Sequence, residues 1–169
     1  MSRRSVRAVP TARFLSLAIA GAAIACAGLT TTNATEGSKS SLPTDTIEAR
    51  RLFEENIDAI HKRDRTRYLA TYLHSSTLAR NGAVGLELGY DNWSARRDST
   101  WPDTLIARNL RVLPISPGVV YGSYCYTVTQ HDTTTSGVSE RIFVKTPQGW
   151  RIAVTTAFGL PVGEPPQCK

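Results

Sequence analysis

Apolar residues follow three patterns along the chain, and each pattern predicts a different kind of segment. Residues 14–25 form an unbroken run of small and apolar side chains behind several arginines. Residues 46–62 carry apolar side chains at the three- and four-residue spacing of a helix. From residue 104 onward apolar and polar positions alternate, as in strands with one buried face. The chain therefore divides into a leader, a helical part and a β-rich part.

The leader has the layout of an export signal. Arginines precede its 12-residue apolar run, and small residues up to Ala25 form a cleavage site. The run is too short to cross a bilayer, which takes roughly 20 apolar residues. We therefore expect residues 1–25 to be a signal peptide, and the protein to be exported to the cell envelope or periplasm.

Cys26 directly follows the cleavage site, where a lipoprotein carries its lipid. Two routes remain open: Cys26 is lipidated and anchors the protein to a membrane, or ordinary cleavage occurs beside it. Ala23 stands where lipoproteins usually have Leu, so the match is partial. Of the 3 cysteines, a lipidated Cys26 would leave Cys125 and Cys168, which either form a disulfide or leave Cys125 as a buried thiol.

The remaining chain divides by composition. Residues 26–43 are rich in Thr, Ser, Gly and Ala and lack apolar periodicity, which predicts a flexible tether. We expect contact with a membrane only through the lipid on Cys26. Residues 44–160 are long enough for one domain with its own core. Residues 161–169 form a C-terminal tail.

The domain pattern places helices before strands. A first helix is expected at 46–62 behind Thr44 or Asp45 as cap, a short second helix behind Asp64, and a third at 90–98. Four strands are expected at 104–113, 118–130, 137–146 and 150–158. This order predicts an α+β domain whose helices cover one face of an antiparallel sheet.

Alternation assigns the strand residues to faces. One face of the last strand carries Trp150, Ile152, Val154, Thr156 and Phe158. On the preceding strand, Glu140 shares a face with Ile142 and Val144. We expect both rows to face the helices, which places the Glu140 carboxylate at the end of an apolar row.

The order of these features resembles the nuclear transport factor 2-like superfamily, above all its SnoaL-like and ketosteroid-isomerase-like domains. The resemblance rests on two short helices joined at residues 62–64, the segment 72–78, and a strand meander ending in residues 149–152. It covers roughly residues 44–158. It implies a cone-shaped, strongly curved antiparallel sheet packed against about three N-terminal helices, with a pocket inside the cone.

The isomerase branch implies three catalytic groups: a carboxylate base, a helix tyrosine and a protonated carboxylic acid. The corresponding positions hold Arg80 or Asn81, then Asn56, then Glu140, so only the last matches in kind. Steroid-type isomerisation is therefore disfavoured. His74, at the end of the second predicted helix, is the histidine best placed for acid–base chemistry.

Charge and motifs narrow the function further. The formal net charge is +6, but four arginines lie in the leader, so the rest of the chain carries +2. The sequence shows no basic stripe of the kind that indicates nucleic-acid binding. The sequence has no Cys-x-x-Cys, His-x-x-x-His or glycine-rich phosphate loop, so we expect neither a metal nor a cofactor.

These observations predict an exported domain that binds a small apolar or amphipathic molecule without catalysis. The expected ligand contacts are Asn56, Arg80, Glu140, Trp150, Ile152, Val154, Thr156 and Phe158. One alternative is a SnoaL-like lyase or isomerase that uses Glu140 or His74 as acid or base. Another is a pocketless interaction module that forms a homodimer through the outer sheet face. Glu140 has its own alternative, a surface ion pair with Arg80, Arg141 or Arg151.

Overall fold

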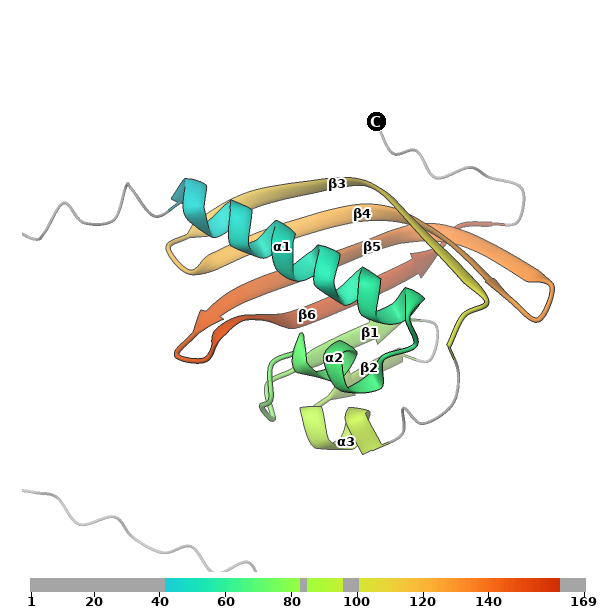
Figure 1. Cartoon of the computed structure of the whole chain (residues 1–169), viewed down its shortest axis with the longest axis horizontal. Coiled ribbons are helices and arrows are strands. Elements are labelled where there is room, and N and C mark those ends of the chain that lie inside the picture. Colours follow the sequence, from blue (N-terminus) through green and yellow to red (C-terminus); the bar gives the residue numbers. More distant parts are fainter. Residues whose placement is uncertain (1–41, 83–84, 96–100, 162–169) are drawn as a thin grey trace, which may run out of the picture. The chain divides into compact units, whose positions relative to one another are not determined.

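The computed structural model describes residues 42–82, 85–95 and 101–161 (Figure 1). The predicted signal peptide, almost all of the tether, Cys26, Cys168 and positions 96–98 of the third predicted helix lie outside these residues. Within them, no helix is long and apolar enough to cross a bilayer.

Three helices and six strands follow one another in the described part of the chain. The elements are α1 (Leu42–His61), α2 (Arg65–Ala70), β1 (Ala79–Gly82), β2 (Gly85–Leu88), α3 (Tyr90–Ala95), β3 (Thr104–Ser116), β4 (Val119–Gln130), β5 (Thr133–Thr146) and β6 (Gly149–Gly159). The strands form one curved sheet in the order β2-β1-β6-β5-β4-β3. The α+β prediction is confirmed, with one difference: β1 runs parallel to β6, so the sheet is mixed.

The two N-terminal helix boundaries differ in how well the sequence predicts them. Asp64 caps α2 as expected, since its Oδ1 accepts a hydrogen bond from the Arg67 amide at 3.0 Å. However, α1 begins at Leu42, inside the predicted tether and before the expected cap. Asp45 is instead buried within α1, where its Oδ2 accepts a hydrogen bond from the Gly118 amide at 2.8 Å. Asp45 thus ties the helix to the β3–β4 turn.

Helix α1 lies across one face of the sheet (Figure 1). Its buried side chains Leu52 and Phe53 belong to a core that also holds Phe143 and Ile152 from the sheet. Phe53 meets the ring of Tyr124 edge-on at 4.7 Å. The solvent side of α1 carries exposed ion pairs. The carboxylate of Asp58 bonds Lys62 at 3.1 Å and Arg67 at 2.9 Å.

A β-bulge in β6 decides which strand residues face α1. Ile142 pairs with Val154, but the next residue, Phe143, pairs with Ile152, so Ala153 is an extra residue in β6. An extra residue reverses the alternation of side chains beyond it. Trp150 and Ile152 are buried against the core as expected.

Beyond the bulge, the predicted faces are wrong. Thr155 and Ala157 point inward and line the cavity described below, whereas Val154, Thr156 and Phe158 lie on the outer face. On β5 the inward residues are Ser139, Arg141 and Phe143, all buried. Glu140, the strand partner of Thr156, therefore faces outward as well.

Candidate functional site

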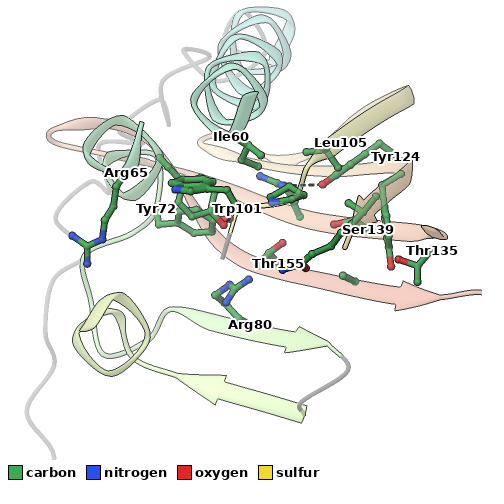
Figure 2. Close-up of a pocket in the computed structure, with 17 residues that line it drawn as sticks. Ile60, Arg65, Tyr72, Arg80, Trp101, Leu105, Tyr124, Thr135, Ser139 and Thr155 are labelled. Carbon is green, nitrogen blue, oxygen red and sulfur yellow. Dashed lines mark hydrogen bonds between the residues drawn. The ribbon is translucent and has the colours of Figure 1, made fainter. Parts of the chain in front are cut away.

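A cavity of about 470 Å³ lies between the helices and the inward face of the sheet (Figure 2). Its wall is built by α1, α2 and five of the six strands, with Trp101 and Pro102 from the segment before β3. Aromatic rings make up much of the wall: Tyr68, Tyr72, Trp101, Tyr124 and Tyr126. Three arginines, Arg65, Arg80 and Arg141, also line it. The described lining contains no Asp, Glu or His.

Arg141 brings a buried positive charge to this wall. Its side chain projects inward from β5 and is only 4% exposed. Its Nη1 donates to Asn56 Oδ1 at 2.7 Å, and its Nη2 donates to the Tyr124 hydroxyl at 2.9 Å. Both acceptors are neutral. Its Nε is buried and has no hydrogen-bond partner within the described part of the chain.

The surroundings of Arg141 keep it charged. Burial acts to lower the pKa of the guanidinium, but its interactions with Tyr124, Tyr72 and Tyr68, which become charge–charge attractions once these phenols ionise, outweigh burial and hold the pKa above its ordinary value. The rings of Phe53 and Tyr124 lie 5.6 Å and 5.3 Å from the guanidinium carbon, within cation–π range. A buried cation with only neutral partners is an expensive arrangement.

Asn56 positions Arg141 from behind. It is fully buried on α1, and its Nδ2 donates to Thr71 Oγ1 at 2.7 Å. The Thr71 hydroxyl in turn donates to the Tyr68 carbonyl at 2.6 Å. This chain of hydrogen bonds orients the amide oxygen that Arg141 uses. Asn56 was expected to contact the ligand directly, but it lies outside the described lining of the cavity.

Arg80 reaches the cavity from β1. Its Nη1 donates to Glu87 Oε2 at 3.2 Å, and its guanidinium carbon lies 4.8 Å from the ring centroid of Trp93. Its Nε is also buried without a hydrogen-bond partner among the described residues. Figure 2 shows its side chain directed from β1 toward Thr155 and Tyr72. Arg80 is a predicted ligand contact that does line the cavity.

Tyr68 of α2 and Tyr72, two residues after that helix, line the cavity together with these arginines. Their hydroxyl oxygens are 3.0 Å apart, and their rings meet edge-on at 5.2 Å. Burial is the main cause that raises the pKa of Tyr68. Burial also opposes ionisation of Tyr72, but the charges of Arg141 and Arg80 outweigh it and lower the pKa of Tyr72. Both guanidinium groups thus act on one phenol.

Glu140 lies on the outer face of the sheet, away from the cavity. The Tyr121 hydroxyl donates to its Oε1 at 2.6 Å, and the Thr156 hydroxyl donates to its Oε2 at 3.4 Å. The expectation that Glu140 faces the pocket is therefore wrong, because the β5 residues that point inward are those of opposite parity. The expected alternative, a surface ion pair with an arginine, is replaced by these hydroxyl partners.

The other predicted site residues also lie apart from the cavity. His74 stacks on Tyr90 with ring centroids 3.9 Å apart and is outside the described lining. Trp150 and Ile152 are core residues, and Phe158 is 51% exposed on the outer face. Val154 and Thr156 share that outer face.

Sequence reasoning missed Arg141 as a site residue. Arg141 lies two residues before Phe143, so alternation places both side chains on the same face of β5, and this could have indicated that Arg141 points inward. However, an Arg in a strand is normally assigned to the solvent face. Thr155 and Ala157 were missed because the bulge at Ala153 leaves no mark in the alternation pattern. No group of three or more His, Cys, Asp or Glu side chains in the described ranges could hold a metal ion.

Comparison with known proteins identifies the fold. No family model matches the chain, and no curated protein matches it in sequence. Solved structures do match. A nuclear transport factor 2-like protein of unknown function from Shewanella oneidensis aligns with a TM-score of 0.59 and 19% identity, over 69% of this chain and 98% of that one.

Two further structures agree. A ketosteroid isomerase-like protein from Erwinia carotovora atroseptica aligns with a TM-score of 0.59 and 14% identity, over 69% of this chain and 97% of that one. A nuclear transport factor 2-like protein of unknown function from Pseudomonas putida aligns with a TM-score of 0.62 and 12% identity, over 73% and 98%. The chain therefore has the α+β fold of the nuclear transport factor 2-like proteins, as the resemblance implied.

Proposed function

We propose that this domain binds a small amphipathic molecule in the cavity between α1 and the sheet. The observation that carries the proposal is the cavity itself. Its volume of about 470 Å³ lies within the range of roughly 300–1,000 Å³ typical of small-molecule sites. Its wall combines aromatic rings with a few fixed polar groups, which is the usual composition of such sites.

The composition of the wall supports binding rather than acid–base catalysis. General acid–base chemistry most often uses a histidine or a carboxylate within hydrogen-bond reach of the substrate. The described lining has neither, and the two residues of the lyase or isomerase alternative, Glu140 and His74, lie elsewhere. We therefore favour the non-catalytic binder.

Native mass spectrometry of protein purified from its own cell envelope tests the proposal. We expect the folded protein to carry a small molecule that dissociates on activation. Ala157→Trp, which places a large ring in the cavity wall, should abolish this adduct. Phe158→Trp, the adjacent position on the outer face, should retain it. An adduct that survives Ala157→Trp unchanged, or a wild-type protein without one that also binds none of the probes described below, would refute the function.

We also propose that the protein is exported and lipid-anchored through Cys26. The leader pattern supports export, and so does Cys125, which is disulfide-bonded, because such bonds persist in oxidising compartments. Cys26→Ser should move the protein from the membrane fraction to the soluble fraction, whereas Cys168→Ser should leave it membrane-bound. Unchanged membrane association of Cys26→Ser would refute lipidation.

A homodimer is the second candidate role. The outer face of the described sheet exposes large apolar side chains on β3 and β6, namely Ile106, Leu113, Ile115 and Phe158. Exposed apolar surface of this kind favours an interaction with another protein copy. Light scattering behind size-exclusion chromatography decides between one and two copies, and Leu113→Glu should convert a dimer to a monomer.

A further inference from the structure

We infer that the molecule bound in the cavity is an organic monocarboxylate, whose acid group lies between Arg80 and Arg141. This inference rests on the proposed binding function and names the chemical class of its ligand. It is carried by three observations: the arrangement of the two arginines, the incomplete neutralisation of their charge, and the aromatic wall around them.

The sheet register brings the two arginines together. Thr155 of β6 pairs with Arg80 of β1 on one side and with Arg141 of β5 on the other. All three side chains line the cavity. Adjacent strands are about 4.8 Å apart, so the two arginine Cα atoms stand about 10 Å apart across Thr155. Two long side chains on this spacing can both reach an acid group placed above the Thr155 hydroxyl.

The charges of this cluster are not balanced. Arg80 is paired with Glu87, and both side chains are less than one-fifth exposed. Arg141 has only the amide oxygen of Asn56 and the hydroxyl of Tyr124. The two guanidinium groups and one carboxylate therefore leave one net positive charge, and the described lining adds no acid to neutralise it. A single negative charge on the ligand would complete the cluster.

The third arginine points away from this cluster and is not part of the count. Arg65 lines the cavity from α2, but its Nη2 donates to the Ser94 carbonyl at 2.9 Å. Figure 2 shows its side chain directed away from Arg80 and Thr155. Arg65 thus bonds at the rim of the cavity, whereas the side chains of Arg80 and Arg141 lie at its interior wall.

Donor geometry favours a carboxylate. A guanidinium has five N–H donors, and Arg141 uses two of them for its neutral partners. A carboxylate offers two oxygens that match the planar fork of an arginine. The rings of Tyr68, Tyr72, Trp101, Tyr124 and Tyr126 would surround the apolar body of the same molecule.

The test compares acids with their neutral isosteres by isothermal titration calorimetry on the folded protein. The probes are 1-naphthaleneacetate, 4-phenylbutyrate and decanoate, each against its primary amide. We expect at least one acid to bind the wild-type protein tenfold or more tightly than its amide. 1-Naphthyl phosphate, which carries more negative charge, should bind no more tightly than 1-naphthaleneacetate.

Variants then locate the acid group. Arg141→Gln should reduce the affinity of the preferred acid to that of its amide, and Arg80→Gln should reduce it at least fivefold. Arg111→Gln removes the same charge from the exposed face of β3 and should leave both affinities unchanged. Arg141→Lys keeps the charge but not the fork, and should give an intermediate preference if Arg141→Gln does not fold.

The outcomes separate this inference from the proposed function. Amides that bind as tightly as the acids would overturn the carboxylate inference while leaving a binding cavity in place. A preference for acids that survives both Arg141→Gln and Arg80→Gln would also overturn it. If neither acids nor amides bind and no native adduct is found, the binding function itself fails.

Discussion

Asn56→Asp tests the charge balance of the cavity without changing the shape of any side chain. The substitution replaces the amide oxygen that accepts the Arg141 hydrogen bond at 2.7 Å with a carboxylate oxygen in the same place. Arg141 then has a permanent anion within the protein. Because Asn56 lies behind Arg141 and not in the described cavity wall, the ligand keeps its space. The substitution also replaces the Nδ2 donor to Thr71 Oγ1 with an oxygen, so the Thr71 hydroxyl must turn from the Tyr68 carbonyl toward the new carboxylate. With that adjustment, the demand for an external anion is removed.

The size of the effect follows from the distance between the two acid groups. A ligand carboxylate on the cavity side of the guanidinium would lie about 5 Å from the new carboxylate. At an effective dielectric constant of about 20, two unit charges at this distance repel by about 3 kcal/mol. Since 1.4 kcal/mol is a factor of ten in affinity, the preferred acid should bind about a hundredfold more weakly.

Calorimetry with an acid and its amide measures this effect directly. The neutral amide should bind Asn56→Asp within about threefold of the wild-type affinity, because the repulsion acts on charge alone. Asn92→Asp, which adds the same charge at an exposed position of α3, is the matched control and should change neither affinity. Urea unfolding establishes that the variant is folded. A folded Asn56→Asp protein that binds the acid as tightly as wild type would refute the role of Arg141 as the anion contact.

Three further predictions concern the sheet and the pH dependence of stability. Glu140→Gln should leave acid binding within about twofold of wild type, since this side chain is bonded on the outer face; a collapse of binding would contradict that placement. Gly137→Ala should lower the free energy of unfolding, measured by urea titration, by roughly 1–3 kcal/mol, because its Cβ would overlap the Phe158 carbonyl oxygen. Gly159→Ala, at the position paired with Gly137 across the strands, is the control and should be nearly neutral, because its Cβ meets no atom within 4 Å. Hydrogen bonds from Lys62 and Arg67 hold the pKa of the Asp58 carboxyl below its ordinary value. The ionised carboxylate therefore stabilises the folded protein at neutral pH, and this stabilisation is lost as the pH falls through the folded pKa. Asp58→Asn should be less stable than wild type at about pH 7 and equal to it at about pH 2.

Local signals in the sequence determined most of the secondary structure. The helical spacing of residues 46–62 and the cap at Asp64 each depend on interactions within a few residues, and both recur in the structure. The four long strands and their hairpins likewise follow from alternation and turn residues between 104 and 159. These features led to the correct α+β fold.

Local sequence patterns did not predict the short strands or the contacts between residues far apart in the chain. β1 and β2 have four residues each, too few for alternation to identify a strand. β1 forms a strand because it pairs with β2 and, in parallel, with β6, more than 70 residues later in the chain. Asp45 resembled a helix cap, but a distant amide at Gly118 takes its carboxylate.

The candidate site was decided by tertiary structure. One extra residue in a strand moves every later side chain to the opposite face. Because of the bulge at Ala153, Thr155 and Ala157 face the cavity in place of the residues that alternation predicts there. The charge of Arg141 tolerates burial because α1 and β4 supply its acceptors, Asn56 and Tyr124. Composition and periodicity describe neighbours along the chain, whereas the cavity and its unbalanced charge depend on strands and helices that meet only in the folded domain.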